Sequence, residues 1–410
     1  MTKYKSKLSL PFKIFIALIL GVLFGIAMTG DSQIAVTYIK PFGDGFLALI
    51  KMVVIPLVFC SLLVGVGSLN NIKQLGRFGI KTIIFFMFTT SIAVMLGLVL
   101  SNLLNVSSGF SMNTNIINKS DVIMKKAPTI AETIINIIPS NPIKSLVDGN
   151  MLQIITFAII LGIALLESGE KGREVFGIFE TIANAMYKII SWIMKLAPIG
   201  VFALIVPAIA TNGAVVIGSL LKLILVAYFV SIAHIILVYG LSVKLIGKIN
   251  PLRFFKTVIP AMLTAFSTSS SSGTLPVSMN VAEKLGVSKT VTSFVLPLGS
   301  TINMDGTAIY QGVCAIFIAK VFGVDLTVGQ QLVIILSATL ASIGTAGVPG
   351  AGMIMLAMVL QSVGLPVEGI ALVAGIDRPL DMMRTVVNVT GDITCSVIVA
   401  NTENKINHKN

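Results

Sequence analysis

The stretch Gly375–Ala400 is long enough to cross a membrane as a helix, yet it carries five ionisable side chains. They are Asp377, Arg378, Asp381, Arg384 and Asp392. At about 100° per helical residue, the three aspartates and Arg384 share one side with Thr385 and Asn388. A charge at the bilayer centre costs at least about 2.5–3.5 kcal/mol. This side must therefore face protein or water rather than lipid.

The mixture of charges on this side indicates the kind of ligand. Arg384 offers a planar fork of donors that matches a carboxylate, and Asp381, one turn earlier, can accept an ammonium group. The stretch therefore predicts an amino acid or a dicarboxylate bound at mid-membrane. The alternative is that the arginines and aspartates only neutralise one another as structural ion pairs.

The composition identifies a polytopic membrane protein. Of 410 residues, 55% are hydrophobic and 11% charged, whereas soluble proteins average about 25% charged. We assign the net charge of +12 to Lys and Arg of cytoplasmic loops, not to a nucleic-acid surface. No HExxH, paired CxxC or nucleotide-binding loop occurs. We therefore expect no enzyme activity, and transport driven by an ion gradient.

The first six apolar runs predict membrane spans at about 11–29, 46–69, 82–104, 130–166, 175–210 and 215–246. The fourth has polar breaks near Pro139–Pro142 and Asp148–Asn150, and the fifth has Pro198 and Pro207 as expected kinks. Basic residues flank the first and last spans, which predicts a multi-pass protein of the cell membrane with both termini in the cytoplasm.

Two later segments each contain two short apolar arms around a polar tip. Residues 254–285 surround Ser267–Thr274, and residues 331–363 surround Ser342–Gly352. An arm of about 10–15 residues crosses half a bilayer, so we expect re-entrant hairpins, the first from the cytoplasm and the second from outside. A flexible serine linker is the alternative for the first tip.

Each hairpin is followed by an irregular span, namely 291–322, broken at Gly299–Thr307, and 375–400. This is the pattern of inverted repeats. Irregular backbone at membrane depth must be buried or line a cavity, so the tips and breaks should meet. Their oxygen ligands, including Asp305 and Asp392, suit a small monovalent cation such as sodium, or the acids can hold a proton. His234, inside the sixth span, is a core histidine or a proton relay.

Four motifs in order resemble the dicarboxylate/amino acid:cation symporters over essentially the whole chain. They are SSSSGTLP (269–276), TINMDGTAIYQG (301–312), SIGTAGVPGAG (342–352) and LDMMRTVVNVTGD (380–392). The resemblance implies an all-α fold of eight transmembrane helices plus two opposed re-entrant hairpins, in a homotrimer. A scaffold would comprise 1–81 and 105–212, and a transport domain 82–104 and 213–404, which moves like an elevator, before a cytoplasmic tail at 405–410.

The resemblance also implies the substrate-binding residues. Arg384 should bind the substrate side-chain carboxylate and Asp381 its amino group. The α-carboxylate should contact Ser270, Ser271 and Asn388. Lining the pocket are Thr307, Val348, Gly352 and Thr385, to which we add Met304 because it lies inside the polar break.

Three sodium sites follow from the same resemblance. The first consists of Gly299, Asn303, Asn388 and Asp392. The second consists of Thr301, Ser342, Ile343 and Thr345, largely through backbone carbonyl groups. The third consists of Thr90, Ser91, Asn303 and Asp305.

The expected function is a secondary active symporter that imports L-aspartate or L-glutamate with sodium. Proton-coupled symport of glutamate or C4-dicarboxylates is the main alternative. Asp392 favours sodium, because proton-coupled relatives can carry Asn there. Ser269 replaces an arginine of archaeal members, and Arg378 is the candidate substitute. An intramembrane aspartyl protease is disfavoured because its Gly-x-Gly-Asp pattern is absent, and a channel because the site has an ammonium partner.

Overall fold

The computed structural model describes residues 10–29, 31–74, 77–107, 138–213, 215–342 and 351–403, which form helices and short connections without a strand among them. The first half consists of α1 (Leu10–Ala27), α2 (Ser32–Ile34), η1 (Ala35–Ile39), α3 (Lys40–Gln74), α4 (Arg77–Leu103), α6 (Pro142–Asp148), α7 (Met151–Glu167), α8 (Glu170–Lys195) and α9 (Ala197–Asn212). The second half consists of α10 (Val215–His234), η3 (Ile235–Gly240), α11 (Leu241–Leu245), α12 (Pro251–Thr268), α13 (Ser271–Lys284), α14 (Lys289–Ile302), α15 (Asp305–Val321), α16 (Val328–Ser342), α17 (Ala351–Ser362), η4 (Val367–Gly369), α18 (Ile370–Ala374) and α19 (Asp377–Thr402).

Several of these helices are long and apolar enough to cross a membrane. In the described part of the chain they are Ser32–Gly67, Phe78–Leu103 and Val215–Leu245. A fourth candidate is the pair α8 and α9, which is bent by 56°. The bend lies where Pro198 opens α9, as the sequence predicts, because proline removes a backbone donor and clashes with the preceding turn. Pro207, in contrast, lies inside α9 without ending it.

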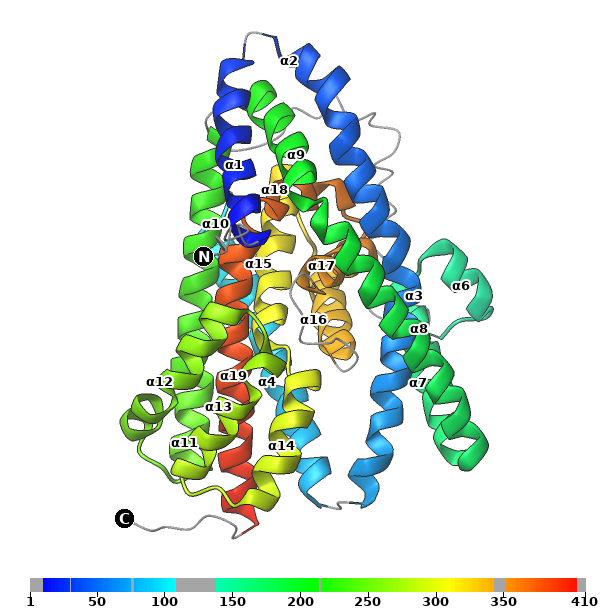
Figure 1. The fold of residues 1–410 in the computed structure, drawn as a ribbon, viewed down its shortest axis with the longest axis vertical. Helices are drawn as coiled ribbons and strands as arrows, with labels where there is room; N and C mark the ends of the chain where they lie inside the picture. The colour runs from blue at the N-terminus through cyan, green and yellow to red at the C-terminus, as the bar shows by residue number, and fades with distance from the viewer. Residues whose placement is uncertain are drawn as a thin grey trace, which may run out of the picture.

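The helices pack in two groups (Figure 1). In the first group α3 contacts α7, α8 and α9, and α1 contacts α9. The other group consists of α4, α10, α12, α13, α14, α15 and α19. Small residues permit the close contacts inside the first group. A Cβ at Gly25 of α1, for example, would lie 2.8 Å from the Cβ of Ile209 in α9. α17 and α18 connect the groups by contacting α3 and α9 respectively.

The helix breaks occur where the sequence places polar residues. α12 ends at Thr268 and is followed by Ser269, whose φ is +50°. Ser270 caps the start of α13, its hydroxyl accepting from the Gly273 amide at 3.1 Å. α14 ends at Ile302, and α15 begins at Asp305. α16 and α17 also pack together, but their connection, 343–350, lies outside the described residues.

α19 is the central element of the second group. It contacts α4, α10, α12, α13, α14 and α15, and lies between them in Figure 1. Its charged side is enclosed accordingly: Arg384 is 3%, Asp381 8% and Asp392 3% exposed. The expectation that these charges face protein rather than lipid is confirmed.

Candidate functional site

Arg384 is the centre of a buried charge cluster on α19. Its Nη1 lies 3.0 Å from Oδ1 of Asp377, and its Nη2 lies 2.8 Å from Oδ1 of Asp381. Both aspartates precede Arg384 by one or two turns, a spacing that places all three side chains on one face. The guanidinium carbon also lies 4.2 Å from the ring centroid of Tyr310 on α15, within the range of a cation–π contact.

A second arginine shares the cluster. Arg378 pairs with Asp381, with 3.7 Å between Nη1 and Oδ2, rather than with its neighbour Asp377. Adjacent helical residues point about 100° apart, whereas residues three apart lie side by side. The structural ion pairs that were the alternative to ligand binding are therefore present in this conformation. The contacts of Arg384 with Asp377 and with Tyr310 were not predicted from the sequence.

The start of α17 approaches the guanidinium directly. A Cβ at Gly352 would overlap Nη1 of Arg384 and lie 2.6 Å from its Cζ. Glycine is therefore required at this position for the observed packing. The positive end of the α17 helix dipole and the arginine charge converge here, a combination that favours an anion between them.

The polar break between α14 and α15 packs against the middle of α19. The Gly306 amide donates to Oδ1 of Asn388 at 2.7 Å, and a Cβ at Gly306 would overlap the Arg384 backbone. The sulfur of Met304 accepts from Asn388 Nδ2 at 3.5 Å and from the Thr307 hydroxyl at 3.7 Å. These residues therefore lie together, close to the charge cluster.

The other predicted substrate-binding residues that the structure describes are Thr385, Ser270 and Ser271, and the hydroxyls of Thr385 and Ser270 bond to the backbone of their own helices. Thr385 is buried and donates its hydroxyl to the Asp381 carbonyl at 2.8 Å. Ser271 is buried in the first turn of α13, which contacts α19, while the Ser270 hydroxyl caps that helix. Val348 lies outside the described residues.

The first predicted sodium site is assembled from the break between α14 and α15 and from α19, which is one continuous helix rather than the irregular span expected at 375–400. Asn303 Nδ2 donates to the Asn388 carbonyl at 2.8 Å and to Oδ1 of Asp392 at 2.9 Å. The Gly299 carbonyl accepts from the Asn303 amide at 2.8 Å. Oδ1 of Asn303 is buried without a hydrogen-bond partner among the described residues. A buried acceptor that lacks a partner beside a carboxylate fits a cation.

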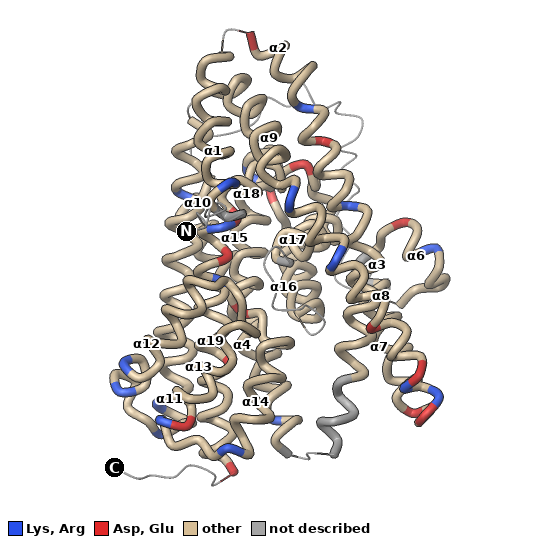
Figure 2. The backbone as a smooth tube through the Cα atoms, in the orientation of Figure 1, with Lys and Arg blue, Asp and Glu red and all other residues tan. Residues whose placement is uncertain are grey.

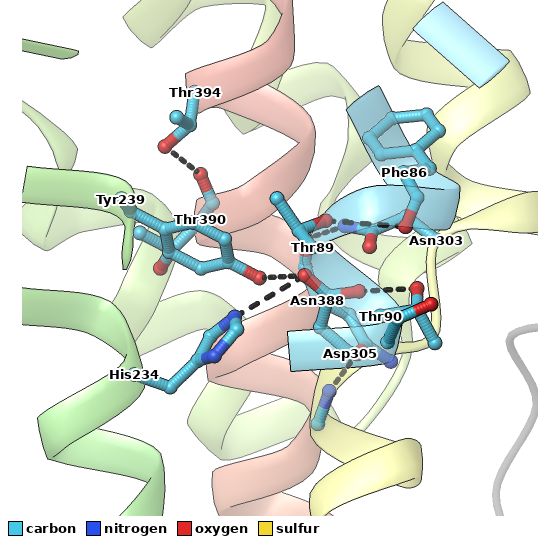
Figure 3. Close-up of polar contacts among 12 residues, drawn as sticks. Phe86, Thr89, Thr90, His234, Tyr239, Asn303, Asp305, Asn388, Thr390 and Thr394 are labelled. Atoms are coloured by element: carbon cyan, nitrogen blue, oxygen red, sulfur yellow. Dashed lines mark hydrogen bonds and ion pairs between the residues drawn. The ribbon is translucent and has the colours of Figure 1, made fainter. Parts of the chain in front are cut away.

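The third predicted site is centred on Asp305, which is fully buried. Its carboxylate accepts from the Thr90 hydroxyl at 2.5 Å and the Tyr239 hydroxyl at 2.8 Å, and lies 3.3 Å from Nε2 of His234 (Figure 3). Tyr239 was not predicted. Ser91 is directed elsewhere, because its hydroxyl donates to the Met87 carbonyl at 2.8 Å and lies 3.3 Å from the Thr339 hydroxyl on α16.

The second predicted site is only partly described. Thr301 donates its hydroxyl to the Pro297 carbonyl at 3.0 Å, and Ser342 donates to the Thr339 carbonyl at 2.7 Å. Both hydroxyls are thus used within their own helices. Ile343 and Thr345 lie outside the described residues.

An apolar helical bundle that encloses buried charged and amide side chains at its centre has the architecture of a membrane transporter. The sequence pattern of the Sodium:dicarboxylate symporter family matches residues 10–402, and the chain belongs to that family. This is a family of transporters, so the expectation that the chain is not an enzyme is confirmed.

Relatives match almost the whole chain. The proton/sodium-glutamate symport protein of Geobacillus stearothermophilus is 41% identical, over 98% of this chain and 96% of its own length. The proton/glutamate-aspartate symporter of Escherichia coli (strain K12) is 36% identical, over 98% and 95%. The C4-dicarboxylate transport protein of Rhodopseudomonas palustris (strain BisB18) is 35% identical, over 97% and 89%.

Proposed function

We propose that this chain is a secondary active symporter that imports L-aspartate or L-glutamate together with sodium ions. The observation that carries the proposal is the buried Arg384 guanidinium. It is paired with two carboxylates of its own helix, Asp377 and Asp381, and lies against the start of α17. Two relatives whose names include glutamate support the substrate class.

Substrate binding is an exchange of ion pairs. The side-chain carboxylate of the substrate replaces Asp381 on Arg384, and Asp381 turns to the substrate ammonium. Every buried charge then keeps a partner, which matters because an uncompensated buried charge costs about 3–5 kcal/mol. Asp377 stays on Arg384 throughout and holds the guanidinium in place.

The remaining contacts follow from the position of this exchange. The α-carboxylate is bound by Asn388 and the serines at the α12–α13 turn, Ser270 and Ser271. The other pocket residues are Met304, Thr307, Val348, Gly352 and Thr385. Asn388 contacts the Asn303–Asp392 cluster through its backbone carbonyl and the pocket through its side chain, so substrate and sodium binding are coupled through one residue.

We assign coupling ions to the three predicted groups of oxygen ligands. The unpartnered Oδ1 of Asn303 supports sodium beside Asp392. Protons are the alternative, since two relatives have names that include protons. The Asp305 carboxylate already accepts two hydroxyl donors, and a cation there would use its remaining lone pairs.

The proposed architecture has eight spans, two opposed hairpins and both termini in the cytoplasm. The scaffold of a homotrimer comprises residues 1–81 and 105–212, with helices α1, α3, α7, α8 and α9. The transport domain comprises residues 82–104 and 213–404, with the group of helices around α19. Packing of the helices in two groups supports an elevator movement of one past the other.

A second candidate is proton-coupled symport of glutamate or C4-dicarboxylates. One observation favours it: Asp381 is already paired with both Arg384 and Arg378, so it does not require an ammonium partner. A C4-dicarboxylate would then bind Arg384 alone. A relative named for C4-dicarboxylate transport supports this possibility.

The deciding experiment is uptake of labelled aspartate, glutamate and succinate by purified protein in proteoliposomes, with sodium and proton gradients imposed separately. Sodium-driven uptake of the amino acids is expected. Arg384→Thr should abolish it, because the carboxylate loses its bidentate donor. Asp381→Asn should abolish amino acid uptake but spare any succinate uptake. Undiminished aspartate uptake by Arg384→Thr would refute the proposed site.

A further inference from the structure

The segment Lys244–Lys256 joins α11 to α12 and is rich in positive charge. It contains Lys244, Lys248, Arg253 and Lys256 but no acidic residue. All four are exposed, and none forms an ion pair with a described residue. Elsewhere in the described chain, ion pairs occupy Lys40, Lys51, Lys81, Lys320, Arg378 and Arg384.

Large apolar side chains stand exposed between these charges. Leu245 is 69%, Ile246 44% and Leu252 80% exposed. Exposed aliphatic groups interleaved with cations are typical of a segment at the boundary between acyl chains and headgroups. The segment lies at an end of the bundle near the end of α19, where Figure 2 shows several basic residues close together.

One of these lysines, Lys248, has an unfavourable backbone conformation. After α11, the Ile249 amide donates to the Val243 carbonyl at 3.2 Å, and the preceding residue, Lys248, has a φ of +52°. This left-handed conformation is usually adopted by glycine or asparagine, because a Cβ is unfavourable there. A lysine at this position is explained if its charge has a function.

The segment is fixed to the helix that carries the site. Asn401 of α19 donates from Nδ2 to the Ile246 carbonyl at 2.8 Å. A Cβ at Gly247 would lie 2.9 Å from Cγ1 of Val397. Asn250 caps α12 by accepting from the Leu252 amide at 2.9 Å. The charges are therefore held in fixed positions relative to α19.

We propose that Lys244–Lys256 binds the phosphodiester headgroups of anionic membrane lipids. The cations contact phosphate oxygens, and the exposed leucines enter the adjoining acyl region. The proposal requires only that the chain lies in a membrane, so it stands apart from the proposed substrate. Because the segment is bonded to α19, bound lipid stabilises the end of that helix.

The other charged helix junction provides a matched control. Between α7 and α8, Lys171 and Arg173 are exposed but lie among Glu167, Glu170 and Glu174. Acidic and basic residues alternate there in Figure 2. Their positive charge is locally balanced, so this junction should not attract anionic headgroups.

The test is native mass spectrometry of the full-length protein in neutral detergent, with phosphatidylglycerol or phosphatidylcholine of identical chains. Phosphatidylglycerol should be retained preferentially. Each lost cation should weaken its affinity about fivefold, which is about 1 kcal/mol. Arg253→Gln with Lys256→Gln should therefore lose about 25-fold, whereas Lys171→Gln with Arg173→Gln, and the charge-keeping pair Arg253→Lys with Lys256→Arg, should retain wild-type affinity.

Three results would overturn the proposal: no preference for phosphatidylglycerol, full affinity in the double glutamine variant, or an equal loss in the control at Lys171 and Arg173. Competition by millimolar inorganic phosphate as effective as that by lipid would show a phosphate site instead. Lys248→Gly separates charge from folding. It should lower lipid affinity about fivefold while leaving the thermal midpoint unchanged or higher, because glycine relieves the backbone.

Discussion

Arg384 has three partners at once. Asp377 accepts a hydrogen bond from its Nη1, the Asp381 carboxylate forms an ion pair with its Nη2, and the ring of Tyr310 lies against its guanidinium carbon. In the proposed binding step only the Asp381 contact is replaced. The contacts with Asp377 and Tyr310 therefore keep the guanidinium in its orientation while the ligand enters. This arrangement reduces the ordering cost that a free, flexible arginine would add to binding.

Asp377→Asn tests the holding role of Asp377. Losing one charged hydrogen bond should destabilise the substrate-free protein by about 1.5–3 kcal/mol. Aspartate should restore part of this, because its carboxylate supplies the missing negative charge. The thermal shift caused by saturating aspartate should thus be larger in the variant than in wild type. Asp325→Asn is the control, since its partner is the exposed Lys320. An equal or smaller shift in Asp377→Asn would contradict this role.

Asp392→Asn tests the proposed sodium site. The substitution keeps the shape of the side chain and an acceptor for Asn303 Nδ2 but removes the negative charge beside the Asn303 side chain, whose Oδ1 has no hydrogen-bond partner. A loss of about 1.5–3 kcal/mol in cation binding should raise the sodium concentration for half-maximal uptake about tenfold or more. Measuring aspartate uptake over a series of sodium concentrations gives this half-maximal value. A titration identical to wild type would assign the coupling ion elsewhere.

The helix breaks depend on local features that can be read from sequence, while the contacts across them cannot. The polar run Gly299–Thr307 predicts the interruption that separates α14 from α15, and the serine run predicts the turn before α13. The contact of Arg384 with Tyr310, and that of Asp305 with Tyr239, depends on how helices far apart in sequence pack. Tyr239 and Asp305 are 66 residues apart. Periodicity along one helix carries no information about such partners.

Gly352→Ala tests the approach of α17 to the charge cluster. The added methyl group would overlap the Arg384 guanidinium and must displace it. Alanine has a higher helix propensity than glycine, which offsets part of the cost of that displacement. We expect a raised KM for aspartate, measured at a temperature below the thermal midpoint of the variant so that unfolding does not contribute. Gly177→Ala on α8 is the control, because open space surrounds that position. An unaltered KM in Gly352→Ala would separate α17 from substrate binding.

At the scale of the whole molecule, an ion pair joins α3 of the first group to η4, which belongs to the proposed transport domain. Lys51 of α3 pairs with Glu368 of η4, with 2.7 Å between Nζ and Oε1, and the partners are 38% and 56% exposed. A pocket of about 150 Å³ lies beside it, bounded by α3, α9 and α18. If the groups move past one another during transport, this pair forms in some states and breaks in others. It therefore biases the equilibrium between them.

Reversing the charge at Lys51 should reveal this bias. Lys51→Glu places two carboxylates together and disfavours the described arrangement by roughly 0.5–1 kcal/mol, which changes the uptake rate about two- to fivefold. The swap Lys51→Glu with Glu368→Lys should restore the rate. Lys320→Glu is the control, because Lys320 pairs with Asp325, five residues further along the chain, with 2.6 Å between Nζ and Oδ1. Equal effects at Lys320 and Lys51, or a swap that restores nothing, would show that the pair does not report movement between the groups.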